Sequence, residues 1–153
     1  MIVVPINYAL KGKEYTEVEF TVTREGVERF CDAIGEAAPA CRDPEAARAL
    51  GYPEQVAPPT FVTTMQVMTT GQAIVDPELG LNFAMVVHGE QAYEYRRPVV
   101  VGDVLRTVPR IADVFAKGRN EFLVIESEIR DASGETVVVA RSTLLSRGTA
   151  ERG

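Results

Sequence analysis

The feature that most constrains this chain is an uncharged stretch, Thr60–Gln72, that directly follows Pro58 and Pro59. Proline is favoured at the first position of a helix, because its missing N–H would have no partner there. A helix that is uncharged on every face belongs in the interior of a protein. Its large apolar side chains are Phe61, Val62, Met65 and Met68. We therefore predict a buried helix over Thr60–Gln72, and this helix needs a cover.

The segments after this helix are typical of strands. Apolar and polar residues alternate in Leu81–His88, and Tyr93 and Tyr95 continue the alternation as expected core residues. Further strands are expected at Val104–Val114, Glu121–Asp131 and Thr136–Leu145. The turn between the last two contains Gly134, which predicts a hairpin.

The segments before the helix predict one strand and two shorter helices. Residues alternate over Glu17–Val22, and Thr23 is a suitable N-cap for a helix over Arg24–Ile34 that Gly35 ends. A short helix is expected over Pro44–Leu50. Together these elements predict one α+β domain over residues 1–153, in which an antiparallel sheet wraps around the buried helix. The open edges of such a sheet favour pairing into a dimer.

Composition argues against several classes of function. The formal net charge of −6 is the wrong sign for a nucleic-acid surface. No apolar run reaches the roughly 18 residues that span a bilayer, so we expect a cytoplasmic protein without a membrane partner. The soft metal ligands are Cys31, Cys41 and the single histidine, His88, which are too few for a zinc site. We therefore expect no metal and no cofactor.

Two motifs resemble the MaoC-like dehydratases. The first is Ala57-Pro58-Pro59-Thr60-Phe61; the second runs from His88-Gly89-Glu90-Gln91 through Tyr93, Tyr95 and Arg96-Arg97-Pro98 to Gly102-Asp103. With Gly51-Tyr52 before the prolines, the chain resembles the N-terminal domain of the MaoC-like, FAS1-like dehydratase family. It is similar to the A-type subunits of mycobacterial (3R)-hydroxyacyl-ACP dehydratases. The resemblance implies a hot-dog fold, a homodimer or heterodimer of hot-dog chains, and an acyl-CoA or acyl-ACP thioester ligand in fatty-acid metabolism.

The resemblance also implies where an acid–base site belongs. The hydratase relatives carry it on a Gly-Asp-x-Asn-Pro-x-His segment, and Gly35–Cys41 matches that segment here. The aspartate has become Glu36, the asparagine Ala38 and the histidine Cys41, so the dyad of the family is not intact. Glu36 and Cys41 are either a modified catalytic pair, or a polar loop residue and a small buried thiol.

The thioester oxygen needs a donor, which the relatives supply from a backbone amide at the start of the buried helix. Pro59 has no N–H to give, so Thr60 or Phe61 is the expected substrate-binding donor. Arg96 and Arg97 either grip the phosphates of CoA or of a carrier-protein phosphopantetheine, or are solubilising residues of an exposed face.

His88 has two interpretations. On a regular strand it would face away from Val87, Tyr93 and Tyr95, as a structural histidine bonded to Glu90 or to the backbone. A bulge at Gly89 would shift the register and turn it into a cleft. In that case His88 is the first candidate for an acid–base residue, with Glu36 as its carboxylate partner.

Three functions are compatible with these residues. The first is a hydro-lyase that hydrates enoyl thioesters or dehydrates (3R)-hydroxyacyl thioesters. The second is a non-catalytic subunit that shapes the acyl tunnel while a partner chain supplies the Asp/His pair, and the altered Gly35–Cys41 segment favours it. A thioesterase is the third, and it typically needs a carboxylate on the buried helix, where Thr60–Gln72 has none.

Overall fold

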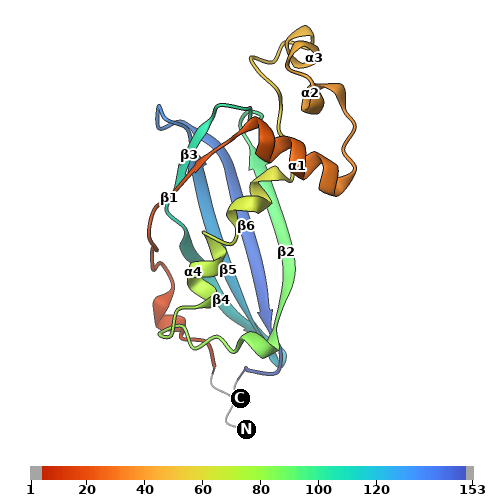
Figure 1. Ribbon diagram of the computed structural model, residues 1–153. Coiled ribbons are helices and arrows are strands. Elements are labelled where there is room, and N and C mark those ends of the chain that lie inside the picture. Colours follow the sequence, from red (N-terminus) through yellow and green to blue (C-terminus); the bar gives the residue numbers. More distant parts are fainter. Residues whose placement is uncertain (1–4, 151–153) are drawn as a thin grey trace.

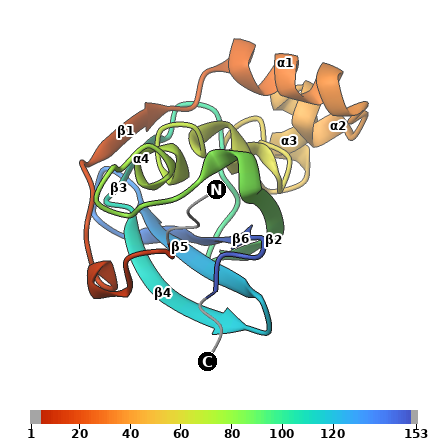
Figure 2. The ribbon, with the colours of Figure 1, turned by 90° about the horizontal axis from the view of Figure 1, so that it is seen from below.

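The computed structural model describes residues 5–150, so residues 1–4 and 151–153 of the predicted domain lie outside the described residues. The described chain forms one antiparallel sheet in the order β1-β3-β5-β6-β2, and β4 also pairs with β5. The strands are β1 (Val18–Thr21), β2 (Val86–Tyr95), β3 (Val104–Thr107), β4 (Arg110–Lys117), β5 (Asn120–Arg130) and β6 (Thr136–Ser146). Figure 2 shows this sheet curled around the segment that contains α4, so the predicted architecture is confirmed.

The helix after the first strand is confirmed with its caps. α1 covers Arg24–Ile34, the Thr23 side chain accepts a hydrogen bond from the Gly26 N–H, and Gly35 follows with a φ of 71°. Glycine takes this left-handed conformation at little cost, so the helix ends there. Two short helices follow, α2 (Pro39–Arg42) and α3 (Pro44–Ala49), and only the second was predicted. α1 lies alongside one end of the sheet, and α2 and α3 lie beyond that end (Figure 1).

The prediction of one continuous buried helix is wrong. The segment forms a 3-10 helix, η2 (Phe61–Met65), then a turn, then the short helix α4 (Thr70–Ile74). Threonine hydroxyls take up main-chain carbonyls here: Thr64 donates to Phe61 O at 2.8 Å and Thr69 to Met65 O at 3.2 Å. Such β-branched residues with local side-chain bonds disfavour a regular helix. Phe61, Val62 and Met65 are buried as predicted, but Met68 is 39% exposed.

Two predicted strands are also corrected. Val104–Val114 is split into β3 and β4 at Pro109, which has no N–H for a ladder hydrogen bond. Leu81–His88 begins as a loop and the 3-10 helix η3 (Phe83–Met85), because Asn82 caps that turn through the Ala84 N–H. Phe83 is 72% exposed and belongs to no core. The hairpin between β5 and β6 is confirmed, with Asp131 N–H bonded to Glu135 O.

The interior consists of two apolar clusters along the helical segment. The first surrounds Phe61, whose ring packs edge-on against those of Phe20 and Phe30. The distances between ring centroids are 6.0 Å to Phe20 and 5.6 Å to Phe30. The second surrounds Leu79, Ile111 and Leu123 near α4. A further 3-10 helix, η1 (Tyr8–Leu10), lies at the start of the described chain. Over residues 5–150, every helix is too short or too polar to cross a membrane.

Candidate functional site

The segment that matches the family's acid–base motif is a tight connection between α1 and α2. The Glu36 carboxylate accepts a hydrogen bond from the Ala38 N–H at 2.8 Å, and Arg42 Nε donates to Glu36 O at 2.8 Å. Pro39 begins α2 at a position that suits proline. The Glu36 side chain therefore stabilises its own loop.

Cys41, at the histidine position of the motif, is a buried thiol. Its side chain is 7% exposed, and its carbonyl accepts hydrogen bonds from Gln55 Nε2 at 2.8 Å and from Cys31 Sγ at 3.7 Å. Burial, and then the neighbouring Cys31, raise the pKa of the Cys41 thiol. A thiol held in its protonated form cannot replace an imidazole that exchanges protons near pH 7.

A mostly apolar cleft of about 420 Å³ opens beside Cys41. Its walls come from α2, from the loop before η2 and from the end of β2, and include Cys41, Val56, Pro59, Tyr95, Arg96 and Val99. The Tyr95 hydroxyl donates to Pro59 O at 2.5 Å, and burial raises the pKa of Tyr95 to about 12. The cleft thus combines apolar walls with one fixed hydroxyl.

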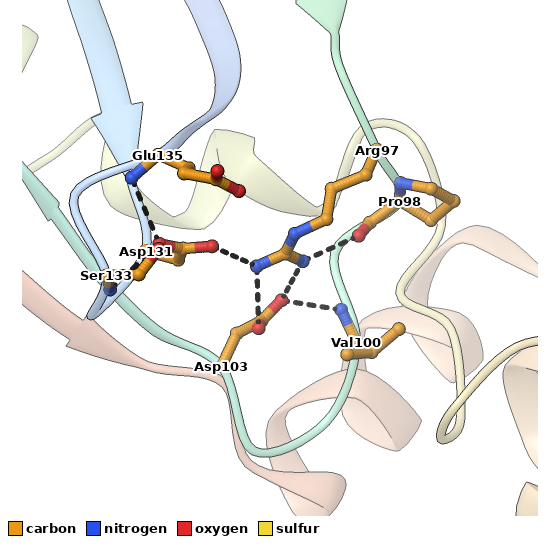
Figure 3. Close-up of polar contacts among 7 residues, drawn as sticks. All are labelled: Arg97, Pro98, Val100, Asp103, Asp131, Ser133 and Glu135. Carbon is orange, nitrogen blue, oxygen red and sulfur yellow. Dashed lines mark hydrogen bonds and ion pairs between the residues drawn. The ribbon is translucent and has the colours of Figure 1, made fainter.

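The two arginines of the second motif differ in their surroundings. Arg97 is held by four contacts: it donates to Pro98 O at 3.0 Å, to both oxygens of Asp103 at 2.8 and 3.0 Å, and to Asp131 at 3.1 Å (Figure 3). Asp103 also accepts from the Val100 N–H. Arg97 therefore connects the end of β2 to the β5–β6 turn. Few N–H groups of its guanidinium remain for the substrate-binding role that was predicted for it.

Arg96 is more available. Its contact is an ion pair with Glu94 at 2.7 Å, in which both side chains are more than half exposed. Such an exposed pair contributes little and exchanges readily. Both arginines line the cleft, and Arg96 is the less engaged of the two, so it is the better candidate to meet a phosphate.

Of the two candidate amide donors, the structure favours Thr60. The Phe61 N–H donates to Pro58 O at 2.8 Å within the turn that begins η2. Thr60 is exposed and adjoins the cleft residue Pro59, but it does not itself line the cleft. In the trans peptide between them, the Thr60 N–H points away from the Pro59 carbonyl that accepts the Tyr95 hydroxyl. Thr60 therefore stays the candidate donor that the sequence suggested.

The bulge at Gly89, which was the condition for the second interpretation of His88, is present. The register of β2 shifts between His88 and Glu90, so His88 lies opposite Leu144 and Gln91 opposite Ser142, both buried residues of β6. His88 Nε2 and Ser142 Oγ are 3.0 Å apart. The expected partner of His88, Glu90 or the backbone, is wrong, because the partner is the Ser142 hydroxyl.

His88 is nevertheless far from the cleft of its own chain. The strand rise of about 3.3 Å per residue puts His88 roughly 23 Å from Tyr95 along β2. Within one chain the structure brings Cys41, Arg96 and Arg97 together around the cleft, with Glu36 in the adjoining loop, and leaves His88 apart.

Sequence reasoning assigned Tyr93 and Tyr95 to the core, but it did not predict the hydrogen bonds of their hydroxyl groups. Both rings are half-buried, with Tyr93 bonded to Thr63 and Tyr95 to Pro59. The available signal was their spacing: two tyrosines two residues apart face the same side of a strand, and a buried tyrosine usually finds a partner for its hydroxyl.

The curled sheet, the enclosed helical segment and the cleft at its start define a hot-dog domain of the MaoC-like dehydratase type. Residues 9–140 match the family model for the FAS1-like dehydratase domain region, and the chain belongs to this family. Its relatives include a UPF0336 protein of Saccharopolyspora erythraea, 43% identical over 148 residues that cover 96% of this chain and 95% of the relative. A UPF0336 protein of Streptomyces coelicolor is 41% identical over 147 residues, 95% of this chain and 98% of the relative.

Solved structures agree with this assignment. The HadBC (3R-hydroxyacyl-ACP dehydratase) complex of Mycobacterium tuberculosis is similar with a TM-score of 0.79 and 28% identity, covering 89% of this chain and 96% of that one. The ChsH1-ChsH2 complex of the same organism is similar with a TM-score of 0.71 and 20% identity, covering 91% and 86%. At 20% identity, the similarity to the ChsH1-ChsH2 complex shows a shared fold and nothing more.

Proposed function

We propose that this chain binds acyl thioesters of the acyl-CoA or acyl-ACP type in the cleft between Cys41 and Tyr95. In this proposal it is the binding subunit of a (3R)-hydroxyacyl-thioester dehydratase, and a second hot-dog chain supplies the acid–base pair. One observation carries the proposal: an apolar cleft lies beside the segment that matches the family's dyad, but a buried thiol lies there in place of the imidazole.

The chemistry requires groups that this cleft does not present. Hydration of a trans-2-enoyl thioester needs a base for water, an acid for the α carbon and a donor for the thioester oxygen. The thiol of Cys41 is held protonated, and the Glu36 carboxylate is engaged by the Ala38 N–H. The N–H of Thr60 and the guanidinium of Arg96 suit binding: the first for the thioester oxygen, the second for a phosphate of CoA or phosphopantetheine.

The edge of the sheet supports the partner. β2 is a terminal strand, so the N–H and C=O groups along its outer edge are available to a strand of another chain. HadBC and ChsH1-ChsH2 are both named as complexes. A second hot-dog chain, either another copy or a different protein, is therefore the proposed occupant of this edge.

A dehydratase formed by two copies of this chain is the second candidate, favoured by the bulge that puts His88 on the same face of the sheet as Ser142. Antiparallel pairing of two β2 strands brings the start of one strand beside the end of the other. His88 of one copy would then lie next to the cleft of its neighbour, which is the site that it cannot reach in its own chain.

Protection of Cys41 tests the binding proposal. In a Cys31→Ser variant, Cys41 is the single thiol, and it lines the cleft. We expect octanoyl-CoA to bind with a measurable heat in calorimetry and to slow alkylation of Cys41 by iodoacetamide at least about tenfold. The Cys31→Ser, Cys41→Ser double variant is the blank for labelling. An unchanged alkylation rate at saturating octanoyl-CoA, or the absence of binding, would overturn the proposal.

A further inference from the structure

Three side chains of β2 connect it to the helical segment in front of the sheet. Tyr95, Tyr93 and Gln91 alternate along the strand and therefore face the same side. The Tyr95 hydroxyl donates to Pro59 O at 2.5 Å, the Tyr93 hydroxyl bonds to the Thr63 hydroxyl, and the Gln66 amide donates to Gln91 Oε1. We call these three bridges the polar ladder.

The two ends of the polar ladder open onto different surroundings. At the Tyr95 end lies the apolar cleft of about 420 Å³. At the Gln91 end lies a void of about 10 Å³, roughly the space of one water molecule. Besides apolar residues, its lining includes the polar side chains of Gln66, Thr69, Thr70, Gln91, Ser127 and Ser142.

We infer that the polar ladder is a stop for the acyl chain and that this cleft takes short acyl groups. The inference rests on the proposed function and names the substrate class of the same site. An acyl chain that passes Tyr95 must separate the hydroxyl of Tyr95 from Pro59 O and then that of Tyr93 from Thr63. Beyond them its methylenes meet amide and hydroxyl groups, which lose hydrogen bonds and gain no apolar contact in return.

The stop predicts how the dissociation constant of an acyl-CoA depends on the length of its acyl chain. Each methylene that an acyl chain buries in an apolar cleft improves the dissociation constant about fourfold. We expect that gain from butanoyl-CoA to about octanoyl-CoA and then a plateau. Hexadecanoyl-CoA, measured below the concentration at which it forms micelles, is expected within about threefold of octanoyl-CoA.

Replacing the polar ladder tests its role. In the double variant Tyr93→Ala, Gln91→Leu, two of the three bridges are lost and one of the six polar side chains at the Gln91 end becomes apolar, while Tyr95, which lines the cleft, is kept. We expect hexadecanoyl-CoA to bind this variant at least about tenfold more tightly than wild type, and butanoyl-CoA to bind both within about twofold. The matched control is Tyr15→Ala, Gln72→Leu, whose side chains bond to Asp76 and to Thr16 and Met68 away from β2. It should retain the plateau.

A second variant protects the test against misfolding. Tyr93→Phe, Gln91→Leu removes the same two bridges but keeps the aromatic ring, so it leaves no cavity at the half-buried position of Tyr93. It should also lengthen the accepted chain. Continued fourfold gains per methylene up to hexadecanoyl-CoA in wild type would refute the stop and leave the proposed function intact. Absence of binding at every chain length would overturn both.

Discussion

His88 Nε2 lies 3.0 Å from Ser142 Oγ, beside a bulge that puts the only histidine of the chain, itself exposed, on the same face of the sheet as Ser142 and Leu144. Without the register shift at Gly89, His88 would face outward like Glu90. The serine fixes one ring nitrogen and leaves the other for a further partner. This pair is therefore the place to look for any activity that the chain has without a different partner.

We expect the purified chain to hydrate crotonyl-CoA weakly, because its cleft holds no group that exchanges protons near pH 7. Whatever turnover remains should fall about a hundredfold or more in His88→Ala, the usual contribution of a general acid–base group. Cys41→Ala and Glu36→Gln are the controls and should change it little. Strong turnover in wild type would contradict the binding-subunit proposal, and turnover that survives all three changes would contradict every site assignment.

The helical segment offers a matched pair of positions for a test of burial. Met65 is 1% exposed and Val67, two residues on, is 84% exposed. Met65→Asp buries a charge without a partner, so we expect a loss of at least about 3 kcal/mol in the free energy of unfolding, or no folded protein. Val67→Asp should change it by less than about 0.5 kcal/mol. Urea unfolding followed by circular dichroism measures both, and equal midpoints would contradict the buried segment.

Arg97 should matter for stability more than for binding. Arg97→Ala leaves Asp103 and Asp131 without their guanidinium, and we expect a loss of about 1–3 kcal/mol in the free energy of unfolding. Arg97→Lys should restore little, because an ammonium group cannot reproduce the forked contact with Asp103. Arg96→Ala is the control: it should leave the unfolding midpoint unchanged and weaken acyl-CoA binding. The opposite pattern would exchange the two roles.

Asp131 gives this cluster a pH dependence. The Ser133 side chain first, and then Arg97, lower the pKa of Asp131 from its ordinary 3.8 to about 2. Since the folded pKa lies below the unfolded one, the stabilisation is complete above about pH 4 and is lost as the pH falls toward 2. We expect Asp131→Asn to be less stable than wild type at pH 7, with the difference shrinking over that window. A difference that stays constant from pH 5 to about pH 2 would refute the assignment.

The open edge of β2 predicts association. Light scattering at micromolar concentration should give about twice the 16.7 kDa mass of the chain. Should the purified protein be a monomer, the edge is expected to bind a different hot-dog chain, and co-expression with candidate partners would recover a heterodimer. A monomer that also captures no hot-dog partner would contradict the proposed use of this edge.

Local signals in the sequence were sufficient for much of the fold. Thr23 and Gly35 fixed both ends of α1, and the glycine turn fixed the last hairpin, because caps and turns depend on a few adjacent residues. The continuous helix over 60–72 failed where threonine hydroxyls bond to the main chain, a competition that apolar periodicity does not register. Pro109 was a visible break that the alternation of Val104–Val114 concealed.

The site was less predictable, because it depends on contacts between distant segments. The family resemblance assigned Cys41 to the acid–base segment, Arg96 was one of two candidates for binding phosphate, and the structure places both beside the cleft. A bulge at Gly89 was foreseen as a condition for turning His88 into a cleft. Asp103 lies in the same motif as Arg97, directly before β3, but Asp131 comes from the β5–β6 hairpin, and nothing in the local sequence of Arg97 indicates that second carboxylate. The hydroxyl partners of Tyr93 and Tyr95 were hidden for the same reason.

The division of the central segment into η2 and α4 bears on how the interior exchanges with solvent. Short helices have few of the repeating hydrogen bonds that make a long helix open as one unit, whereas β5 and β6 are paired along their whole lengths. Amide protons over 61–74 should therefore exchange with deuterium through local opening, well before those of the sheet. Opening of residues 61–74 should then cost less free energy than opening of the strands behind them, which keep their register.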